Sequence, residues 1–154
     1  WTDSHLHDFH WRGERFGLPD PEFDEERVVD ERTVTLKELG LSIKDRLEYV
    51  YDFGDGWEHV LTVEQVLEAG EHQTPVCLKG ARSCPPEDCG GAWGYENLLD
   101  ILKDPTHEEY EEWKTWLPEN FDPEQCDLAE VNRALSVKQW TLSPSSKKGR
   151  RKKV

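Results

Sequence analysis

The stretch LEYVYDFGDGWEHVLTVEQV, residues 47–66, carries the clearest β signal in this 154-residue chain. Leu47, Tyr49 and Tyr51 recur with the period of two that is typical of a strand, and the second half of the stretch alternates in the same way. Between the halves lies Gly54-Asp55-Gly56, which tolerates the positive φ that a tight connection needs. The stretch therefore predicts a β-hairpin.

The residues before the hairpin predict further β structure and a loop. His5–Trp11 reads as a short strand on which His5 and His7 share one face. Residues 13–31, rich in Pro, Asp and Glu, predict an acidic surface loop, and residues 32–36 a second short strand.

The residues after the hairpin predict three helices. An apolar stripe at helical spacing runs from Tyr95 to Leu102, and Pro105 ends it. Thr106 with Glu109, and Asp127 with Glu130, have the spacing of capping boxes that open two more helices. Strands followed by helices indicate an α+β fold: an antiparallel sheet with a β-hairpin, then a Cys/Pro/Gly-rich loop and three C-terminal helices.

Charge divides the chain into an acidic body and a basic end. The net charge is −14, although the last eight residues, KKGRRKKV, are mostly basic and contain no acid. An acidic body repels phosphate backbones, so nucleic acid is an unlikely partner for the body. The tail, residues 143–154, is predicted to be disordered; it is either a nucleic-acid tether or nuclear address, or simply a solvated end.

The domain is predicted to span residues 1–142. Because the chain begins at Trp1 and has no methionine, we expect it to be a fragment without its natural start. The sequence contains no run of about 18 apolar residues, the length that a membrane-spanning helix needs. We expect a cytoplasmic protein with an unidentified protein partner.

Cys77 to Tyr95, CLKGARSCPPEDCGGAWGY, combines three thiols with Pro and Gly. Cys84 and Cys89 have the spacing of a zinc-ligand pair, and Cys77 would be a third ligand, so zinc is the predicted cofactor. A histidine or Cys126 would complete the tetrahedron. Two alternatives stay open, namely buried free thiols and disulfides.

A second set of candidates consists of histidines and carboxylates. The Cβ atoms of residues i and i+2 on one strand face lie about 7 Å apart, so two imidazoles there can share a metal. If the first strand packs beside the hairpin, this set converges at one sheet end and suits zinc, manganese or iron: His5, His7, Asp52, Asp55 and His59. The alternative is that the histidines are half-exposed sheet residues and the aspartates form the turn. Glu87 and Asp88 could serve as base and ligand, or could cap a turn.

Three segments resemble the Ri-plasmid Orf-three-like domain family: DSHLHDFHW at 3–11, YDFGDGWEH at 51–59 and CLKGARSCPPEDCGGAWGYE at 77–96. The turn at 121–123 and the DLAEVNRAL segment that follows also fit, so the resemblance covers about residues 1–136. It implies a compact α+β domain, with an upstream strand and helix that this chain lacks. The motif residues that match here are His5, His7, Asp52, Asp55, Trp57, His59, Cys77, Cys84, Pro86, Glu87, Asp88, Cys89, Gly90, Gly91, Gly94 and Tyr95.

The resemblance carries no established activity. Members are sometimes described as transposon-passenger, resolvase-like proteins, which implies a link to mobile elements. This chain has no serine-recombinase pattern, and its acidic body argues against a resolvase.

Two functions follow as hypotheses. The first is an interaction or scaffold module whose loop is stapled by zinc at Cys77, Cys84 and Cys89. The alternative is a metal-dependent hydrolase or nuclease that uses the histidine and aspartate set, with Glu87 as a further catalytic candidate.

Overall fold

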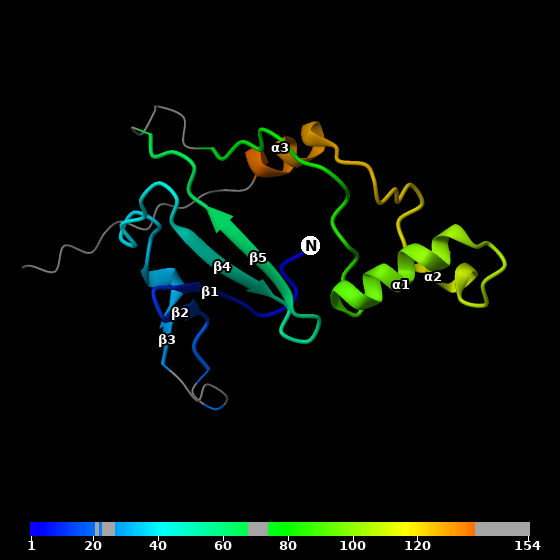
Figure 1. The fold of residues 1–154 in the computed structure, drawn as a ribbon, viewed down its shortest axis with the longest axis horizontal. Helices are drawn as coiled ribbons and strands as arrows, with labels where there is room; N and C mark the ends of the chain where they lie inside the picture. The colour runs from blue at the N-terminus through cyan, green and yellow to red at the C-terminus, as the bar shows by residue number, and fades with distance from the viewer. Residues whose placement is uncertain (21, 23–26, 68–73, 138–154) are drawn as a thin grey trace, which may run out of the picture.

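The computed structural model describes residues 1–20, 22, 27–67 and 74–137, and the fold is a sheet followed by helices (Figure 1). The strands are β1 (His7–Trp11), β2 (Glu14–Gly17), β3 (Val28–Asp30), β4 (Arg46–Tyr51) and β5 (Trp57–Thr62). A single 3-10 turn, η1, spans Glu31–Thr33, and the helices are α1 (Gly91–Lys103), α2 (Tyr110–Trp116) and α3 (Leu128–Val137). The predicted α+β class with C-terminal helices is confirmed. The predicted basic tail lies outside the described residues.

The sheet has the strand order β3-β2-β1-β4-β5. The predicted hairpin is β4–β5, antiparallel, with Leu47 opposite Leu61 and Tyr51 opposite Trp57. β1 pairs antiparallel with both β2 and β4, whereas β2 and β3 are parallel. The sheet is therefore mostly antiparallel, with one parallel pair that the hairpin pattern does not predict.

Two local predictions between the first strand and the hairpin were wrong. Residues 13–31, expected to be a loop, contain β2 and β3. The prediction failed because short strands with few apolar positions resemble acidic loops in sequence. Residues 32–36, expected to be a strand, instead contain the end of η1 and then residues that form no strand. The Asp30 side chain accepts a hydrogen bond from the Arg32 backbone N–H at 3.0 Å, which favours a turn there.

One face of the sheet is strongly aromatic. Directly opposed residues project to the same side, so Phe9 shares a face with Phe16 and Tyr49, its partners on β2 and β4. On β5, His59 lies opposite Tyr49 on that face. The rings of Phe9 and Tyr49 lie 4.7 Å apart, centre to centre.

The predicted apolar stripe of α1 is buried, whereas only one of the two predicted capping boxes marks the start of its helix. α1 buries Leu98 and Ile101. α3 begins as predicted, since Asp127 Oδ1 accepts a hydrogen bond from the Glu130 N–H at 2.9 Å. The predicted capping box at Thr106 is wrong: its hydroxyl donates to Asp104 Oδ1 at 2.7 Å, and α2 begins four residues later.

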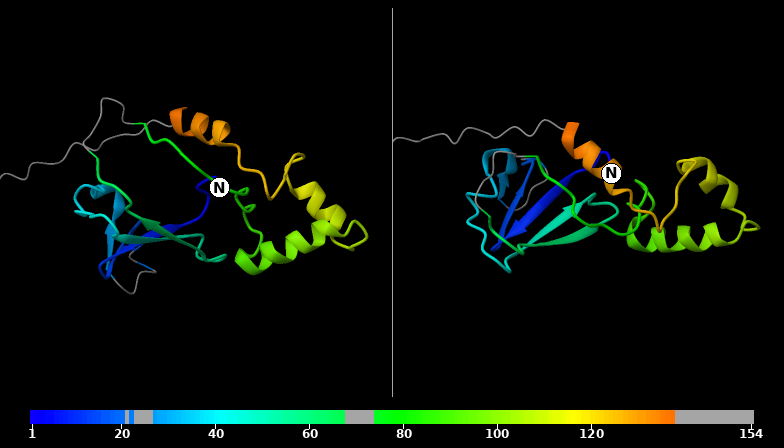
Figure 2. Two further views of the ribbon diagram at one scale, coloured as in Figure 1. Left: turned by 45° about the horizontal axis from the view of Figure 1, so that its top comes forward. Right: turned by 90° about the horizontal axis from the view of Figure 1, so that it is seen from above.

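The sheet and the α1–α2 pair lie at opposite ends of the molecule in all views (Figure 2). The β4–β5 turn is the part of the sheet that lies beside the start of α1. A small core there contains Cys89, Leu98 and Leu117, against which Trp57 of β5 packs. No helix in the described part of the chain is long and apolar enough to cross a membrane.

Candidate metal centre

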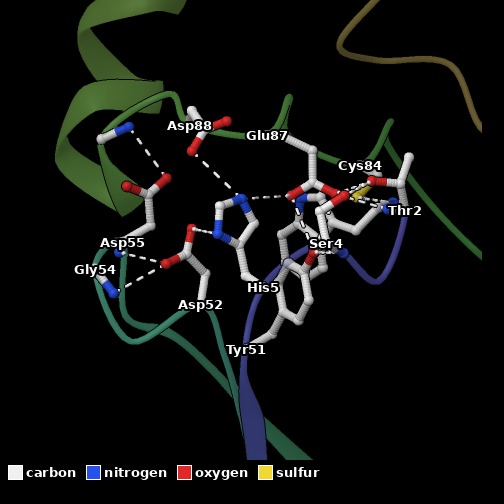
Figure 3. Close-up of polar contacts among 12 residues, drawn as sticks. Thr2, Ser4, His5, Tyr51, Asp52, Gly54, Asp55, Cys84, Glu87 and Asp88 are labelled. Atoms are coloured by element: carbon white, nitrogen blue, oxygen red, sulfur yellow. Dashed lines mark hydrogen bonds and ion pairs between the residues drawn. The ribbon is translucent and has the colours of Figure 1, made fainter.

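Three segments that are distant in sequence meet where the sheet approaches α1 (Figure 3). They are residues 2–5 before β1, the β4–β5 turn at residues 52–56, and the loop at residues 84–90 before α1. The side chain of His5 lies at the centre, between carboxylates from the other two segments.

The β4–β5 turn fixes the position of Asp52. The Asp52 backbone has a φ of 56°, in the left-handed region, and its carbonyl accepts a hydrogen bond from the Gly56 N–H at 2.6 Å. Oδ1 accepts hydrogen bonds from the N–H groups of Gly54 at 2.9 Å and Asp55 at 3.3 Å. Asp52 is 7% exposed, and its other oxygen, Oδ2, remains directed at His5. The turn therefore presents one buried carboxylate oxygen to the histidine.

The loop before α1 is held against that turn. The Gly90 N–H donates to Asp55 Oδ2 at 3.1 Å. Gly91 has a φ of 66°, and a Cβ on it would overlap the Asp55 carbonyl oxygen, so only glycine allows this approach. Asp88 also has a positive φ, 56°. Sparsely populated backbone conformations of this kind are found more often at functional sites.

His5 bridges the two segments through both ring nitrogens. Nδ1 lies 3.6 Å from Asp52 Oδ2, and Nε2 lies 3.3 Å from Asp88 Oδ1. One ligand atom from each of the three residues lies within 4.8 Å of the others, the separation expected around one metal ion. A histidine binds a metal through one nitrogen while the other is held by a hydrogen-bond partner, so one carboxylate can also orient the ring. Imidazole with carboxylates suits zinc, manganese or iron.

Glu87 lies beside this group. Its Oε2 is 4.0 Å from His5 Nε2, and the Tyr51 hydroxyl donates to its two oxygens at 3.1 and 3.2 Å. The Thr2 backbone N–H donates to Oε1 at 2.6 Å. Burial favours a higher pKa for Glu87, but the hydrogen bonds from Thr2 and Tyr51 outweigh it and lower the pKa. Burial and the bond to Glu87 raise the pKa of Tyr51, so this hydroxyl stays a donor and Glu87 stays a carboxylate.

The structure separates His7 and His59 from His5. β1 begins at His7, so His5 precedes the strand and the period-two argument does not apply to it. His7 Nε2 lies 3.1 Å from Glu31 Oε1, and His7 Nδ1 lies 3.6 Å from Asp3 Oδ1. His59 contacts the Tyr49 carbonyl at 3.3 Å through Nδ1.

Of the predicted histidine and aspartate set, the metal-compatible group contains His5 and Asp52. Asp55 lies nearby but binds the Gly90 N–H. The sequence indicated Asp88 as half of an acidic pair that could serve as base and ligand, and as a residue that matches the family motif, but not as a partner of His5. Tyr51 was predicted only as a strand residue.

The cysteines occupy different surroundings, and all four are free thiols. Cys77 is fixed through its backbone, whose N–H donates to Asn132 Oδ1 at 2.7 Å. Cys84 is exposed, whereas Cys89 is 4% exposed in the core beside Leu98. Burial, with the nearby Asp55 charge, raises the pKa of Cys89 to about 11, so it is a neutral thiol at pH 7.

Within the described ranges, no group of three metal-ligand side chains includes a cysteine. The zinc site at Cys77, Cys84 and Cys89 thus stays a prediction. His5, in contrast, belongs to a group of side chains that lie close enough together to bind one ion.

The fold and the motif positions together define a family. The family model described as plasmid pRiA4b ORF-3-like protein matches residues 1–130, and this chain belongs to that family. The resemblance inferred from the three segments is thereby confirmed.

Two similar proteins carry descriptions without a function. An uncharacterized protein of Sinorhizobium fredii (strain NBRC 101917 / NGR234), y4hQ, is 36% identical over 136 residues, which are 88% of this chain and 70% of that protein. The crystal structure of a protein of unknown function from Methanosarcina mazei Go1, MM3350, is similar with a TM-score of 0.71 and 36% identity. That match covers 84% of this chain and 74% of the other.

Proposed function

We propose that His5, Asp52 and Asp88 bind one divalent transition-metal ion and that the protein is a metal-dependent hydrolase. The observation that carries the proposal is the approach of the three ligand atoms to within 4.8 Å of one another. They come from three separate segments, so only the folded chain assembles them.

The donor set supports a catalytic rather than a structural ion. Three protein ligands leave coordination positions for water, whereas structural zinc sites are closed by four. An ion held by His5, Asp52 and Asp88 would supply a water that ionises near neutral pH. Glu87, whose Oε2 lies 4.0 Å from His5 Nε2, would be near enough to accept a proton from such a water.

The body's charge limits the substrate. An acidic protein repels polynucleotides, which favours small or weakly charged substrates over DNA or RNA. The acidic surroundings also raise the local concentration of cations, which supports metal binding.

The zinc-stapled scaffold module is a second candidate that the geometry favours less. Its support is the spacing of Cys84 and Cys89, but the neutral, buried Cys89 must lose its proton and move toward an ion. A metal titration distinguishes the two candidates, because the scaffold module would bind zinc through cysteines and the hydrolase would bind its ion through His5, Asp52 and Asp88.

Calorimetric titration of Mn²⁺ and Zn²⁺ into chelator-treated protein tests the binding step. His5→Asn, Asp52→Asn and Asp88→Asn should each weaken binding by about 100-fold, because each removes one of the three proposed ligands. Asparagine tolerates positive φ, so both aspartate variants keep their backbone. His7→Asn is the matched control and should bind as wild type. Equal binding by His5→Asn and His7→Asn would reject the site, whereas loss in Cys84→Ser would favour the zinc staple.

Hydrolysis of p-nitrophenyl acetate and of p-nitrophenyl phosphate, with and without metal, tests the chemical step. We expect metal-dependent turnover that falls at least 10-fold in Glu87→Gln, while metal affinity changes little. Tight metal binding without turnover on either substrate would retain the metal site and count against hydrolysis.

A further inference from the structure

A hollow of about 560 Å³ lies beside the candidate metal centre, between the loop before α1 and the helix α2. The loop contributes Asp88 to its lining, and α2 contributes Glu112, Trp113, Thr115 and Trp116. Asp88 Oδ1 also lies 3.3 Å from His5 Nε2, so the hollow and the candidate metal centre share this residue (Figure 3). A substrate bound at the centre can therefore extend into the hollow.

The wall that α2 contributes is aromatic. Trp113 and Trp116 are three positions apart, so their side chains leave the helix as neighbours on its surface. Trp113 is half-buried and also packs against the core that contains Cys89 and Leu98, whereas Trp116 is 61% exposed. The core thus fixes one indole, and the other is open to a ligand.

The charges around the hollow are negative. The Asp88 side chain is 60% exposed and Glu112 is exposed as well, so a ligand can reach both carboxylates. Among the described residues that line the hollow, none is basic. Glu112 makes no ion pair with another described residue, so its charge is available to a ligand. A divalent ion held by Asp52 and Asp88 would have its charge balanced by these two ligands and would not repel a cation nearby.

We propose that this hollow binds a quaternary ammonium group, and that the substrate of the proposed hydrolase is a carboxylic ester that carries one. The faces of indole rings attract cations, and quaternary ammonium ions are bound by aromatic side chains in this way. The carboxylate of Glu112 adds an attraction that requires no N–H donor on the ligand. A primary ammonium ion is strongly hydrated and gains less from an open aromatic wall. The binding of the ammonium group depends on the hollow alone, whereas the assignment of the substrate rests on the proposed function.

The reaction on such a substrate is an ordinary ester hydrolysis. Water adds to the ester carbonyl carbon, and the bond from that carbon to the alcohol oxygen breaks. The products are a carboxylate, the alcohol that keeps the ammonium group, and one proton.

An NMR titration of chelator-treated protein tests the binding of the ammonium group. The two probes are choline and the uncharged alcohol in which a tert-butyl group replaces the trimethylammonium group. We expect choline to bind at least about 5-fold more tightly and to shift the indole N–H signals of Trp113 and Trp116. Sodium chloride keeps the ionic strength constant, which holds general attraction to the acidic protein constant. Equal binding of the two alcohols would overturn the proposal.

Two matched pairs of variants locate the site. Glu112→Gln and Trp116→Ala should each weaken choline binding about 5-fold, because each removes one attraction. Glu111→Gln is the control for charge, since Glu111 is exposed on α2 but does not line the hollow. Trp93→Ala is the control for the indole, since Trp93 is 86% exposed on α1. Losses in the controls as large as those in the variants would reject the hollow as the binding site.

The acetate esters of the same two alcohols test the substrate assignment in the presence of Mn²⁺. We expect kcat/KM to be at least about 5-fold higher for acetylcholine, and Glu112→Gln but not Glu111→Gln to remove the difference. Choline binding without hydrolysis of either ester would reject the substrate assignment and keep the ammonium site. Metal-dependent hydrolysis of both esters at equal rates would reject the ammonium site as a determinant of specificity and keep the hydrolase.

Discussion

His5 and His7 lie two residues apart, and each ring stands between two carboxylates. Nδ1 is 3.6 Å from an aspartate in both cases, and Nε2 lies 3.3 Å from Asp88 in one and 3.1 Å from Glu31 in the other. The carboxylates around His5 converge within metal-sharing distance, whereas those around His7 form no such group in the described residues. The two histidines have the same types of neighbour, yet only around His5 do the carboxylate oxygens lie close enough to one another to bind one ion. The positions of the carboxylates, and not the residue types alone, therefore define the candidate site.

The two histidines also differ in what supports them. Beside His5, Asp52 Oδ1 accepts hydrogen bonds from the N–H groups of Gly54 and Asp55, and one ring, Tyr51, lies 6.0 Å away. Beside His7 lie two rings, Tyr49 at 5.7 Å and Phe9 at 6.1 Å. Backbone hydrogen bonds preorganise ligands, whereas aromatic packing creates an apolar surface.

Separating the loop from the turn should produce the largest effect. Gly91→Ala places a Cβ against the Asp55 carbonyl at a positive φ, and we expect a loss of roughly 3 kcal/mol in the free energy of unfolding. Gly40→Ala is the control, because its φ is also positive but nothing lies within 4 Å; it should cost about 1 kcal/mol. Urea denaturation measures both, and equal losses would show that the loop is not held against the turn as described.

A bound metal ion should raise the free energy of unfolding only in proteins that keep His5. At 100 times the dissociation constant, an ion that binds only the folded state adds about 2.7 kcal/mol to the free energy of unfolding. The gain should appear in wild type and His7→Asn and be absent in His5→Asn. A similar gain in all three proteins would show that the ion binds elsewhere.

The smallest predicted effect concerns the support of Glu87. Tyr51→Phe removes the hydroxyl that donates to Glu87 and accepts from the Ser4 N–H, at a cost of about 1 kcal/mol. Without that hydrogen bond, the pKa of Glu87 should rise, because hydrogen bonds to the ionised form keep it low. A carboxyl ¹³C NMR titration of Glu87 checks this, and an unchanged pKa would contradict it.

The sequence predicted the framework well because its signals are local. Alternation from Leu47 to Tyr51 and the glycines of the turn define the hairpin, and Asp127 does cap α3. Two strands in residues 14–30 were missed because they are short and their pairing is set by the rest of the sheet.

The site was only partly predictable because its geometry depends on tertiary contacts. His5 and Asp52 do lie together as the sequence predicted, but the start of β1 at His7 separates the two histidines. The approach of Asp88 depends on its positive φ and on the packing of Gly91 against the turn, and no periodicity in the sequence reports either.

The most direct test of the account is a crystal structure of the protein soaked in Mn²⁺, with anomalous diffraction recorded for manganese. The account predicts one strong anomalous peak between His5 and Asp88, within coordination distance of His5, Asp52 and Asp88, and no peak beside His7. A peak at Cys84 and Cys89, or none between His5 and Asp88 at saturating Mn²⁺, would contradict it.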